Sequence, residues 1–424
     1  RIMLEVFRGC TRGCRFCQAG MIWRPYRERN ALLIRKMAAE ALDATGHDEI
    51  SLLALSSGDY SLIEPLMQAL MKVHQEKRVT LALPSLRVES LSEVLIEEIK
   101  RTRKTSFTLA PEAGTDRMRR AINKGNTAED LLRSVDQVFS AGWKSIKLYF
   151  MIGLPGEEEE DLDGIADLAG QVLRAARRRG QVTVSLSTFV PKPHTPFQWA
   201  AQLSVEEIQS RQNYLRKKMQ NRHLVVKWHD ARMSMLEGLL SRGDERIGDL
   251  LLCAHRKGCR FDGWGELFRF DLWEEAIKET GLEIDDYLSE RSISEPLPWD
   301  NIDCGLSRAF LVAEKDKAAA GEETPDCRQN ECSACGVCDF QEIQNIFSEK
   351  EEPPSPAKTG WEEELIRETI YRIRFIKTGS ARFLSHLELA AALTRALRRS
   401  SLALAFTEGF HPHPKISFAT ATPV

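Results

Sequence analysis

Apolar residues along this chain gather in short runs that alternate with amphipathic, helix-like stretches. Six of the runs are strand-like, being rich in β-branched or apolar residues, and all six end before residue 190. They are Ile2–Phe7, Ile50–Leu55, Val79–Leu83, Ser106–Leu109, Ser145–Met151 and Val182–Phe189. Strands that alternate with helices form a parallel sheet. The pattern therefore predicts an α/β fold, with its chemistry at the carboxyl ends of the strands.

Composition narrows the class of protein. The 424 residues are 42% hydrophobic and 29% charged, which suits a large core divided into about two or three domains. No apolar run approaches the ~20 residues of a membrane span, so we expect a cytoplasmic protein without membrane contact. Seven of the ten cysteines stand in two tight groups, which indicates metal ligation rather than disulfides. Both ends interrupt strand-like runs, so we expect an internal fragment.

The first cysteine group follows the first strand-like run. Cys10, Cys14 and Cys17 have C-x3-C-x2-C spacing. Three thiolates this close reach three corners of a four-iron cubane and leave the fourth iron open for a ligand. Gly9 and Gly13 permit the tight loop that such ligation needs. Three arginines in the loop are expected to offset the negative charge of the cluster: Arg8, Arg12 and Arg15.

Zinc is the alternative metal, because it also binds three cysteines together with a fourth ligand. The next candidate ligands are His47 and Cys253, and both lie far along the chain. The spacing therefore favours an iron–sulfur cluster.

With Phe16 before its third cysteine, this loop resembles the signature of the radical S-adenosylmethionine (radical SAM) enzymes. The resemblance implies a catalytic [4Fe-4S] cluster whose open iron binds S-adenosylmethionine. An electron from a reductant such as flavodoxin or ferredoxin then cleaves the cofactor, and the resulting 5'-deoxyadenosyl radical abstracts hydrogen from a substrate. The resemblance also implies that the six strand–helix units form an open, partial (β/α)6 TIM-like barrel.

Other strand ends resemble the cofactor-binding segments of this family. The turn after the second strand keeps only Gly58 and the acidic Asp59 of the family's Gly-Gly-Glu segment, and an ordinary glycine turn is the alternative. Glu112 resembles the acidic residue of a Glu-x-Gly element, and Gly153 begins a Gly-x-Pro-Gly-Glu turn. The expected S-adenosylmethionine contacts are Phe16, Ser57, Gly58, Asp59, Glu112 and Gly153.

Three further residues at strand ends are candidate substrate contacts. Arg87 follows the third strand, and Lys192 and His194 stand in a proline-rich loop after the sixth. Structural or solvated roles are the alternative for each of them.

Two motifs narrow the resemblance within the family. The segments 110–115 and 189–199 are similar to those of methylthiotransferase-like and cobalamin-domain-fused radical SAM proteins. This implies methylthiolation or methylation as the reaction, and cobalamin bound by a domain outside the sequence.

A second cysteine group ends the region that follows the barrel. Ser204 is expected to cap a helix at 203–219. Further along, four cysteines have C-x4-C-x2-C-x2-C spacing: Cys327, Cys332, Cys335 and Cys338. Four thiols this close predict one metal site, and both an auxiliary iron–sulfur cluster and a zinc ion fit the spacing.

The last part of the chain follows a charged, proline-rich linker. Strands are expected at Tyr371–Ile376 and Ile416–Ala419 around a helix at Leu387–Arg399, as the start of a small α+β domain similar to a domain of unassigned function in such proteins. Residues 371–424 hold eight basic residues against two acidic ones. This predicts an RNA-binding surface, with a solvated basic face as the alternative.

The predicted organisation is a barrel at 1–200, a helical accessory region at 201–345, a linker at 346–360 and the basic domain at 361–424. The leading hypothesis is a radical SAM enzyme with an unknown substrate. The alternatives are a non-catalytic RNA-binding module with two structural metal sites, and an electron carrier with two clusters.

Overall fold

The computed structural model describes residues 1–74, 78–83, 86–102, 107–176, 180–329, 332–349, 369–400, 402–408 and 413–418. Most of the predicted linker lies outside the described residues, at 350–360, as does Ala419 at the end of the last predicted strand.

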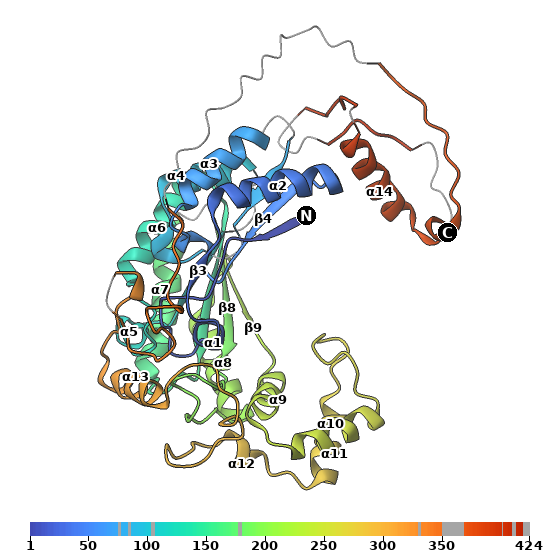
Figure 1. The fold of residues 1–424 in the computed structure, drawn as a ribbon. Helices are drawn as coiled ribbons and strands as arrows, with labels where there is room; N and C mark the ends of the chain where they lie inside the picture. The colour runs from blue at the N-terminus through green and yellow to red at the C-terminus, as the bar shows by residue number, and fades with distance from the viewer. Residues whose placement is uncertain are drawn as a thin grey trace.

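Parallel strands form the centre of the first half of the chain (Figure 1). A strand lies at each of the six predicted positions, so the α/β prediction is confirmed. Within the described residues the strands form two ladders, of order β1-β4-β5 and β6-β7-β8-β9, and every neighbouring pair in them is parallel. Their bounds are β1 Ile2–Glu5, β4 Glu49–Leu53, β5 Thr80–Ala82, β6 Phe107–Glu112, β7 Ser145–Ile152, β8 Gln181–Thr188 and β9 Leu224–Trp228. The sequence pattern missed β9, a short strand whose last residue, Trp228, is exposed.

Helices follow the strands and lie in an arc outside them (Figure 1). Several begin at the expected capping residues: Thr127 Oγ1 accepts from the Asp130 N–H, and Ser204 Oγ accepts from the Glu207 N–H. The helix predicted at 203–219 is thereby confirmed as α8. The bounds are α1 Gln18–Ile22, α2 Ala31–Thr45, α3 Ile63–His74, α4 Glu93–Thr102, α5 Asp116–Ala121, α6 Ala128–Ser140, α7 Glu159–Ala175 and α8 Val205–Lys218.

Each ladder has its own hydrophobic core. In one, Ile146 and Leu148 of β7 are fully buried together with Val135 of α6. In the other, Leu52 of β4 packs with buried residues of α2 and α3. The two cores hold the strands parallel, so the loops that follow the strands meet at one edge. In the described residues, no helix combines the length and the apolar character needed to cross a membrane.

The accessory region is helical, as expected. Its first helices share an apolar cluster around the buried Trp273, whereas α13 returns to the barrel and contacts α5. The bounds are α9 Ala231–Arg242, α10 Arg246–Lys257, α11 Phe270–Thr280, α12 Ile284–Leu288 and α13 Arg308–Ala320. A short antiparallel pair, β2 Phe7–Arg8 and β3 Arg27–Glu28, flanks the first cysteine group. Three-residue 3-10 turns are η1 Ser57–Asp59, η2 Val88–Ser90 and η3 Cys327–Gln329.

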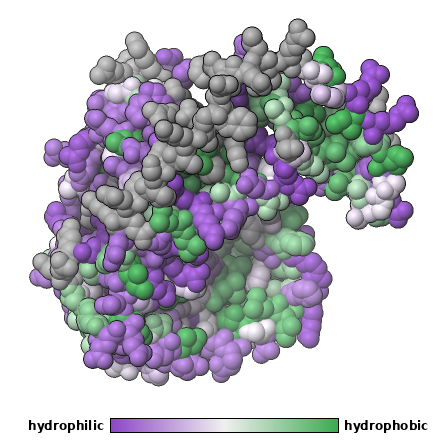
Figure 2. All heavy atoms as spheres, turned by 45° about the horizontal axis from the view of Figure 1, so that its top comes forward, coloured by the Kyte–Doolittle hydropathy of each residue, from purple (hydrophilic) through white to green (hydrophobic). Residues whose placement is uncertain are grey.

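The C-terminal part departs from the prediction in its strands. The predicted helix is present as α14 His386–Arg399, after a 3-10 turn η4 Gly379–Phe383. Residues 371–376 and the described residues 416–418 form no strand. A strand needs a partner for its backbone groups, yet Tyr371 and Ile376 are 80% and 85% exposed. Figure 2 shows apolar side chains on the part at the upper right, where α14 lies in Figure 1.

Candidate active site and the adjoining cysteine segment

The first cysteine loop lies between β2 and α1, beyond the end of the first parallel strand. Cys17 is the N-cap of α1, and its Sγ accepts from the Gly20 N–H at 3.3 Å. Gly9 has a φ of 89°, and a Cβ there would lie 2.5 Å from the Pro25 carbonyl oxygen. Only glycine fits this backbone, because both the conformation and the space exclude a side chain. The presence of glycine at position 9 is also a reason to expect a tight loop here from the sequence.

The loop's donor set fits the three thiolate ligands of a four-iron cluster. Two of the sulfurs face N–H donors, since Arg87 Nη1 lies 3.6 Å from Cys14 Sγ and donates to it, as Gly20 does to Cys17. Burial and the charge of Cys14 together raise the pKa of the Cys10 thiol to about 12. A metal that binds this thiol compensates the charge of the thiolate and so favours ionisation.

The three loop arginines pair with carboxylates, and their effect on the charge of a cluster stays a prediction. Arg8 contacts Glu5 at 3.0 Å, and the buried Arg15 contacts Glu314 at 3.0 Å. Arg12 contacts Asp59. Their role is to fasten the loop to its surroundings.

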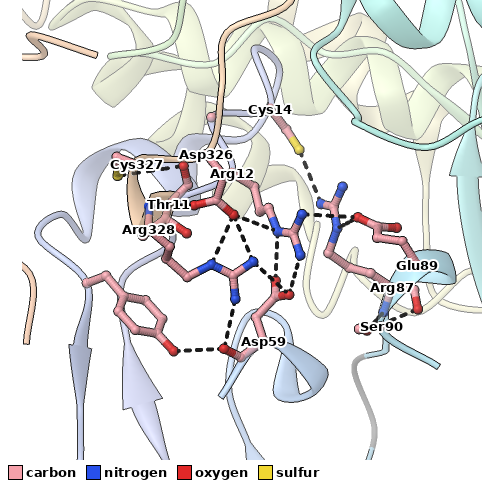
Figure 3. Close-up of polar contacts among 12 residues, drawn as sticks. Thr11, Arg12, Cys14, Asp59, Arg87, Glu89, Ser90, Asp326, Cys327 and Arg328 are labelled. Carbon is pink, nitrogen blue, oxygen red and sulfur yellow. Dashed lines mark hydrogen bonds and ion pairs between the residues drawn. The ribbon is translucent and has the colours of Figure 1, made fainter. Parts of the chain in front are cut away.

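A network of alternating charges joins this loop to η1 and to the second cysteine group (Figure 3). Arg12 lies 2.5 Å from Asp59 and 3.1 Å from Asp326. Arg328 contacts the same two carboxylates at 3.3 and 2.8 Å. Burial opposes ionisation of Asp59, but its hydrogen bonds to Arg12 and the charge of Arg328 hold its pKa below the ordinary value. Asp59 is therefore an ionised anchor for the two guanidinium groups.

The other residues of that turn have structural partners. Ser57 Oγ donates to the Leu52 carbonyl at 2.9 Å. A Cβ at Gly58 would lie 2.3 Å from Ser90 Oγ, so the missing side chain lets η1 pack against η2. A cofactor contact through the backbone of this turn stays a prediction.

Glu112 and Gly153 stand at the ends of two neighbouring strands. Glu112 ends β6 with a φ of 69°, and its carboxylate lies 3.1 Å from Lys124 Nζ. A non-glycine residue in this conformation is strained, and such strain concentrates at functional sites. Gly153, after β7, donates its N–H to Glu157 at 2.7 Å. Burial raises the pKa of Glu157 to about 7, although the Gly153 N–H and Arg211 act against that rise.

The remaining candidate residues lie in two places, some at the cysteine loop and others away from it. Phe16 packs on an apolar cluster that includes Ala113 beyond β6 and Leu154 beyond β7. Arg87 lies next to the cysteine loop, where its Nη1 contacts Cys14 Sγ. Lys192 points to α9, where Nζ contacts Glu237 at 2.6 Å. His194 lines a separate cavity of about 350 Å³ with Asp303 and other residues of the accessory region. Arg87 therefore lies beside the cysteine loop that contains Phe16, whereas Lys192 forms its ion pair with a residue of α9.

Two residues that hold the loop were not singled out from the sequence. Asn123 Nδ2 donates to the Arg12 and Gly13 carbonyls at 3.0 and 3.3 Å, and Asn123 Oδ1 accepts from the Thr324 N–H at 2.9 Å. Glu314, the buried partner of Arg15, lies in α13. No local pattern marks either residue, because their partners are distant in sequence.

The second cysteine group adjoins the first loop. Cys327 Sγ lies 3.8 Å from the Thr11 carbonyl and accepts from Asn345 Nδ2 at 3.5 Å. Burial raises the pKa of the Cys338 thiol, and the charges of Cys335, Cys327 and Cys332 raise it further. The Cys338 thiol is therefore within electrostatic reach of the other three thiols.

Among the residues that the structure describes, no three His, Cys, Asp or Glu side chains are arranged to hold a single metal ion. In an iron–sulfur cluster each thiolate binds a different iron, so this finding concerns single-ion sites.

Two models of known protein families match parts of this chain. Residues 4–169 match the model of the Radical SAM superfamily, and residues 370–424 match that of a family described as an uncharacterized protein conserved in bacteria (DUF2344). An uncharacterized protein of Methanocaldococcus jannaschii is 31% identical over 59% of this chain and 53% of its own. The ribosomal protein uS12 methylthiotransferase RimO of Caldanaerobacter subterraneus subsp. tengcongensis is 25% identical over 38% of each chain.

Two further similarities are more distant. A tRNA-2-methylthio-N(6)-dimethylallyladenosine synthase of Cereibacter sphaeroides is 29% identical over 39% of each chain. Among solved structures, the radical S-adenosylmethionine methyltransferase TsrM from Kitasatospora setae has a TM-score of 0.36 at 14% identity, over 43% of this chain and 35% of that one. The chain spans about half the length of the first of these relatives, and less of the others.

The match covers the cysteine loop, Arg12 and Asp59 of the charge network, and the strained Glu112, whereas Asp326 and Arg328 of that network lie outside it. The family implies a [4Fe-4S] cluster, S-adenosylmethionine and an external reductant. Residues 4–169 therefore form a domain of the radical SAM type.

Proposed function

We propose that this chain cleaves S-adenosylmethionine reductively at Cys10, Cys14 and Cys17 and uses the radical for a methylthiolation or methylation. The observation that carries the cleavage is the loop itself. Three thiols stand on a backbone that only glycine permits at Gly9, and two of their sulfurs accept N–H donors. When bound, the cluster supplies the electron for cleavage.

The chain's own residues bind and orient the cofactor. The Glu112 carboxylate, held by Lys124, is an anionic acceptor next to the loop and is suited to the hydroxyl groups of a ribose. Gly153 has a φ of 84°, and a Cβ there would lie 2.9 Å from Leu203 Cδ1, so glycine at this position accommodates Leu203. The contact of this turn with the base of the cofactor remains part of the proposal. Phe16 and its apolar neighbours exclude water from this side of the site.

The reaction class rests on weaker support. The relatives named for methylthiolation act, by their names, on a ribosomal protein or a tRNA, and each covers less than half of this chain. An RNA or ribosome-linked substrate is our proposal for this chain, consistent with the positive charge of residues 371–424. Cobalamin, implied by the resemblance, stays a prediction for residues outside this chain. The radical SAM domain argues against the non-catalytic alternative.

The test of cleavage is formation of 5'-deoxyadenosine by anaerobically reconstituted, reduced protein. Cys14→Ala should reduce the yield at least ~100-fold, since the cluster loses one ligand. Cys253→Ala, which changes a buried cysteine of the accessory region, should leave the yield near that of the unchanged protein. Equal yields from Cys14→Ala and the unchanged protein would overturn the proposal.

A separate measurement tests the substrate class. Purified tRNA and ribosomes are incubated with the active protein and analysed by mass spectrometry for an added methyl or methylthio group. Modification of either supports the proposed substrate class. No modification, with 5'-deoxyadenosine still formed, would refute that class and leave cleavage intact.

A further inference from the structure

We propose that Cys327, Cys332, Cys335 and Cys338 bind a second, anionic metal centre that docks on the first cysteine loop and has Arg24 as its counter-charge. The inference is independent of the reaction proposed above, because it concerns metal content. The centre that fits is an iron–sulfur cluster, in which each thiolate binds a different iron, because no three of the described side chains are arranged around a single ion such as zinc.

The cysteine segment is built to keep its ligands together. Gly336 has a φ of 97°, and a Cβ there would lie 3.2 Å from the Ser307 backbone nitrogen. The Cys335 carbonyl accepts from that same Ser307 N–H at 2.9 Å. The Ala334 N–H donates to Cys332 Sγ at 3.3 Å. N–H donors on a sulfur stabilise the thiolate form that a metal requires.

The segment is also fastened on both sides of its cysteines, to the first loop before them and to Tyr26, just before β3, after them. Before them, Asp326 pairs with Arg12 at 3.1 Å, and Cys327 Sγ reaches the Thr11 carbonyl. After them, Asn345 Oδ1 accepts from the Tyr26 N–H at 2.9 Å, while its Nδ2 donates to Cys327 Sγ. These contacts hold the second thiol group beside the first loop.

Arg24 supplies the independent observation. Its Nη1 is buried and finds no hydrogen-bond partner among the described residues. The guanidinium lies 5.2 Å from the ring centre of Phe310, and Phe310 belongs to the same apolar cluster as Cys335. Arg24 is half-buried and its Nε donates to the Gly20 carbonyl at 3.3 Å, so one buried N–H group of the guanidinium is left without a partner. A buried donor without an acceptor is costly. A thiolate-bound metal centre provides the missing negative charge.

Metal analysis tests the proposal directly. Protein reconstituted anaerobically with iron and sulfide, and protein isolated without reconstitution, are assayed for iron, zinc and acid-labile sulfide. We expect about eight iron ions per chain, whereas about four iron ions together with about one zinc ion would overturn the second iron–sulfur centre. Cys332→Ala should lose the second centre and keep the first, because Cys332 is exposed and its replacement leaves the fold intact. Cys304→Ala, a nearby cysteine outside the group, should keep both.

A second pair of variants tests the counter-charge. Arg24→Gln should lower occupancy of the second centre several-fold, whereas Arg27→Gln, which changes an exposed arginine of the adjoining β3, should not. Iron sufficient for one cluster and no zinc in the unchanged protein would overturn the inference. So would equal metal contents in Cys332→Ala and the unchanged protein. Failure of S-adenosylmethionine cleavage with both centres present would instead count against the proposed function alone.

Discussion

The two cysteine groups differ in what holds them in place. Cys10, Cys14 and Cys17 are fixed by local backbone, between a strand pair and the first turn of α1. The second group has little regular structure beyond η3 and depends on side-chain contacts with the first loop. Cys14 is 9% exposed, whereas Cys332 is exposed. The spacing of the cysteines predicted both groups, whereas the contacts that hold the second group beside the first loop are visible only in the fold.

The largest expected effect comes from Arg15, which ties the first loop to α13. Arg15→Ala removes a fully buried guanidinium from Glu314 and from the Ala121 and Glu322 carbonyls, while Glu314 keeps its contacts with Lys317 and Thr324. We therefore expect a loss of roughly 3–5 kcal/mol in the free energy of unfolding. Chemical denaturation of the metal-free protein measures it. Arg120→Ala, an exposed arginine, should change stability by less than about 0.5 kcal/mol. Equal stability of Arg15→Ala and Arg120→Ala would show that the first loop does not depend on α13.

A matched glycine pair compares the two backbones directly. Gly9→Ala must accept a left-handed conformation and a clash with the Pro25 carbonyl, and should cost about 2–3 kcal/mol. Gly336→Ala meets the same conformation with a milder contact and should cost about 1 kcal/mol. Denaturation midpoints give the order. A larger loss at Gly336 would reverse the comparison.

Loss of the Asp326 carboxylate, which links the two cysteine groups, should have a smaller effect on stability. Asp326→Asn removes one carboxylate from the network, but Arg12 keeps Asp59 and Glu89, the latter at 3.5 Å. We therefore expect a loss of about 1 kcal/mol and lower metal occupancy in the second group only. Iron analysis of both groups checks this, and a loss confined to the first group would contradict it.

Lys192 should give the smallest effect. It lies outside both cysteine groups, and its pair with Glu237 is at the surface. Lys192→Ala should change stability by about 0.5 kcal/mol or less and leave metal content unchanged. The same variant tests our prediction of a substrate contact, because a lower kcat/KM with unchanged 5'-deoxyadenosine formation would support that role.

The sequence predicted most of what depends on local pattern. Six strands alternating with helices predicted the parallel architecture, and the cysteine spacing with Gly9 predicted the loop that matches the radical SAM family. It missed β9, a run of five residues. The predicted strands at 371–376 and 416–419 are absent from the residues that the structure describes there. An apolar pattern forms a strand only where a partner strand is available for its backbone groups.

The side-chain architecture of the site was less predictable. Asp59 was expected at the cofactor, and its pairing with Arg12 depends on a contact between positions 47 residues apart. The Asn123 contacts and the Arg15–Glu314 pair span still greater separations. Spacing arguments describe neighbours in the chain, whereas these contacts are fixed by the packing of α13 and the second cysteine segment on the barrel.

The buried pair of Arg15 and Glu314 also sets an order of events during synthesis. The two residues are 299 positions apart. At roughly 5–20 residues per second, the ribosome adds the second about 15–60 s after the first. During that interval the catalytic loop exists without the helix that covers it. A cluster inserted then would meet an open loop, and one inserted later would have to enter past α13.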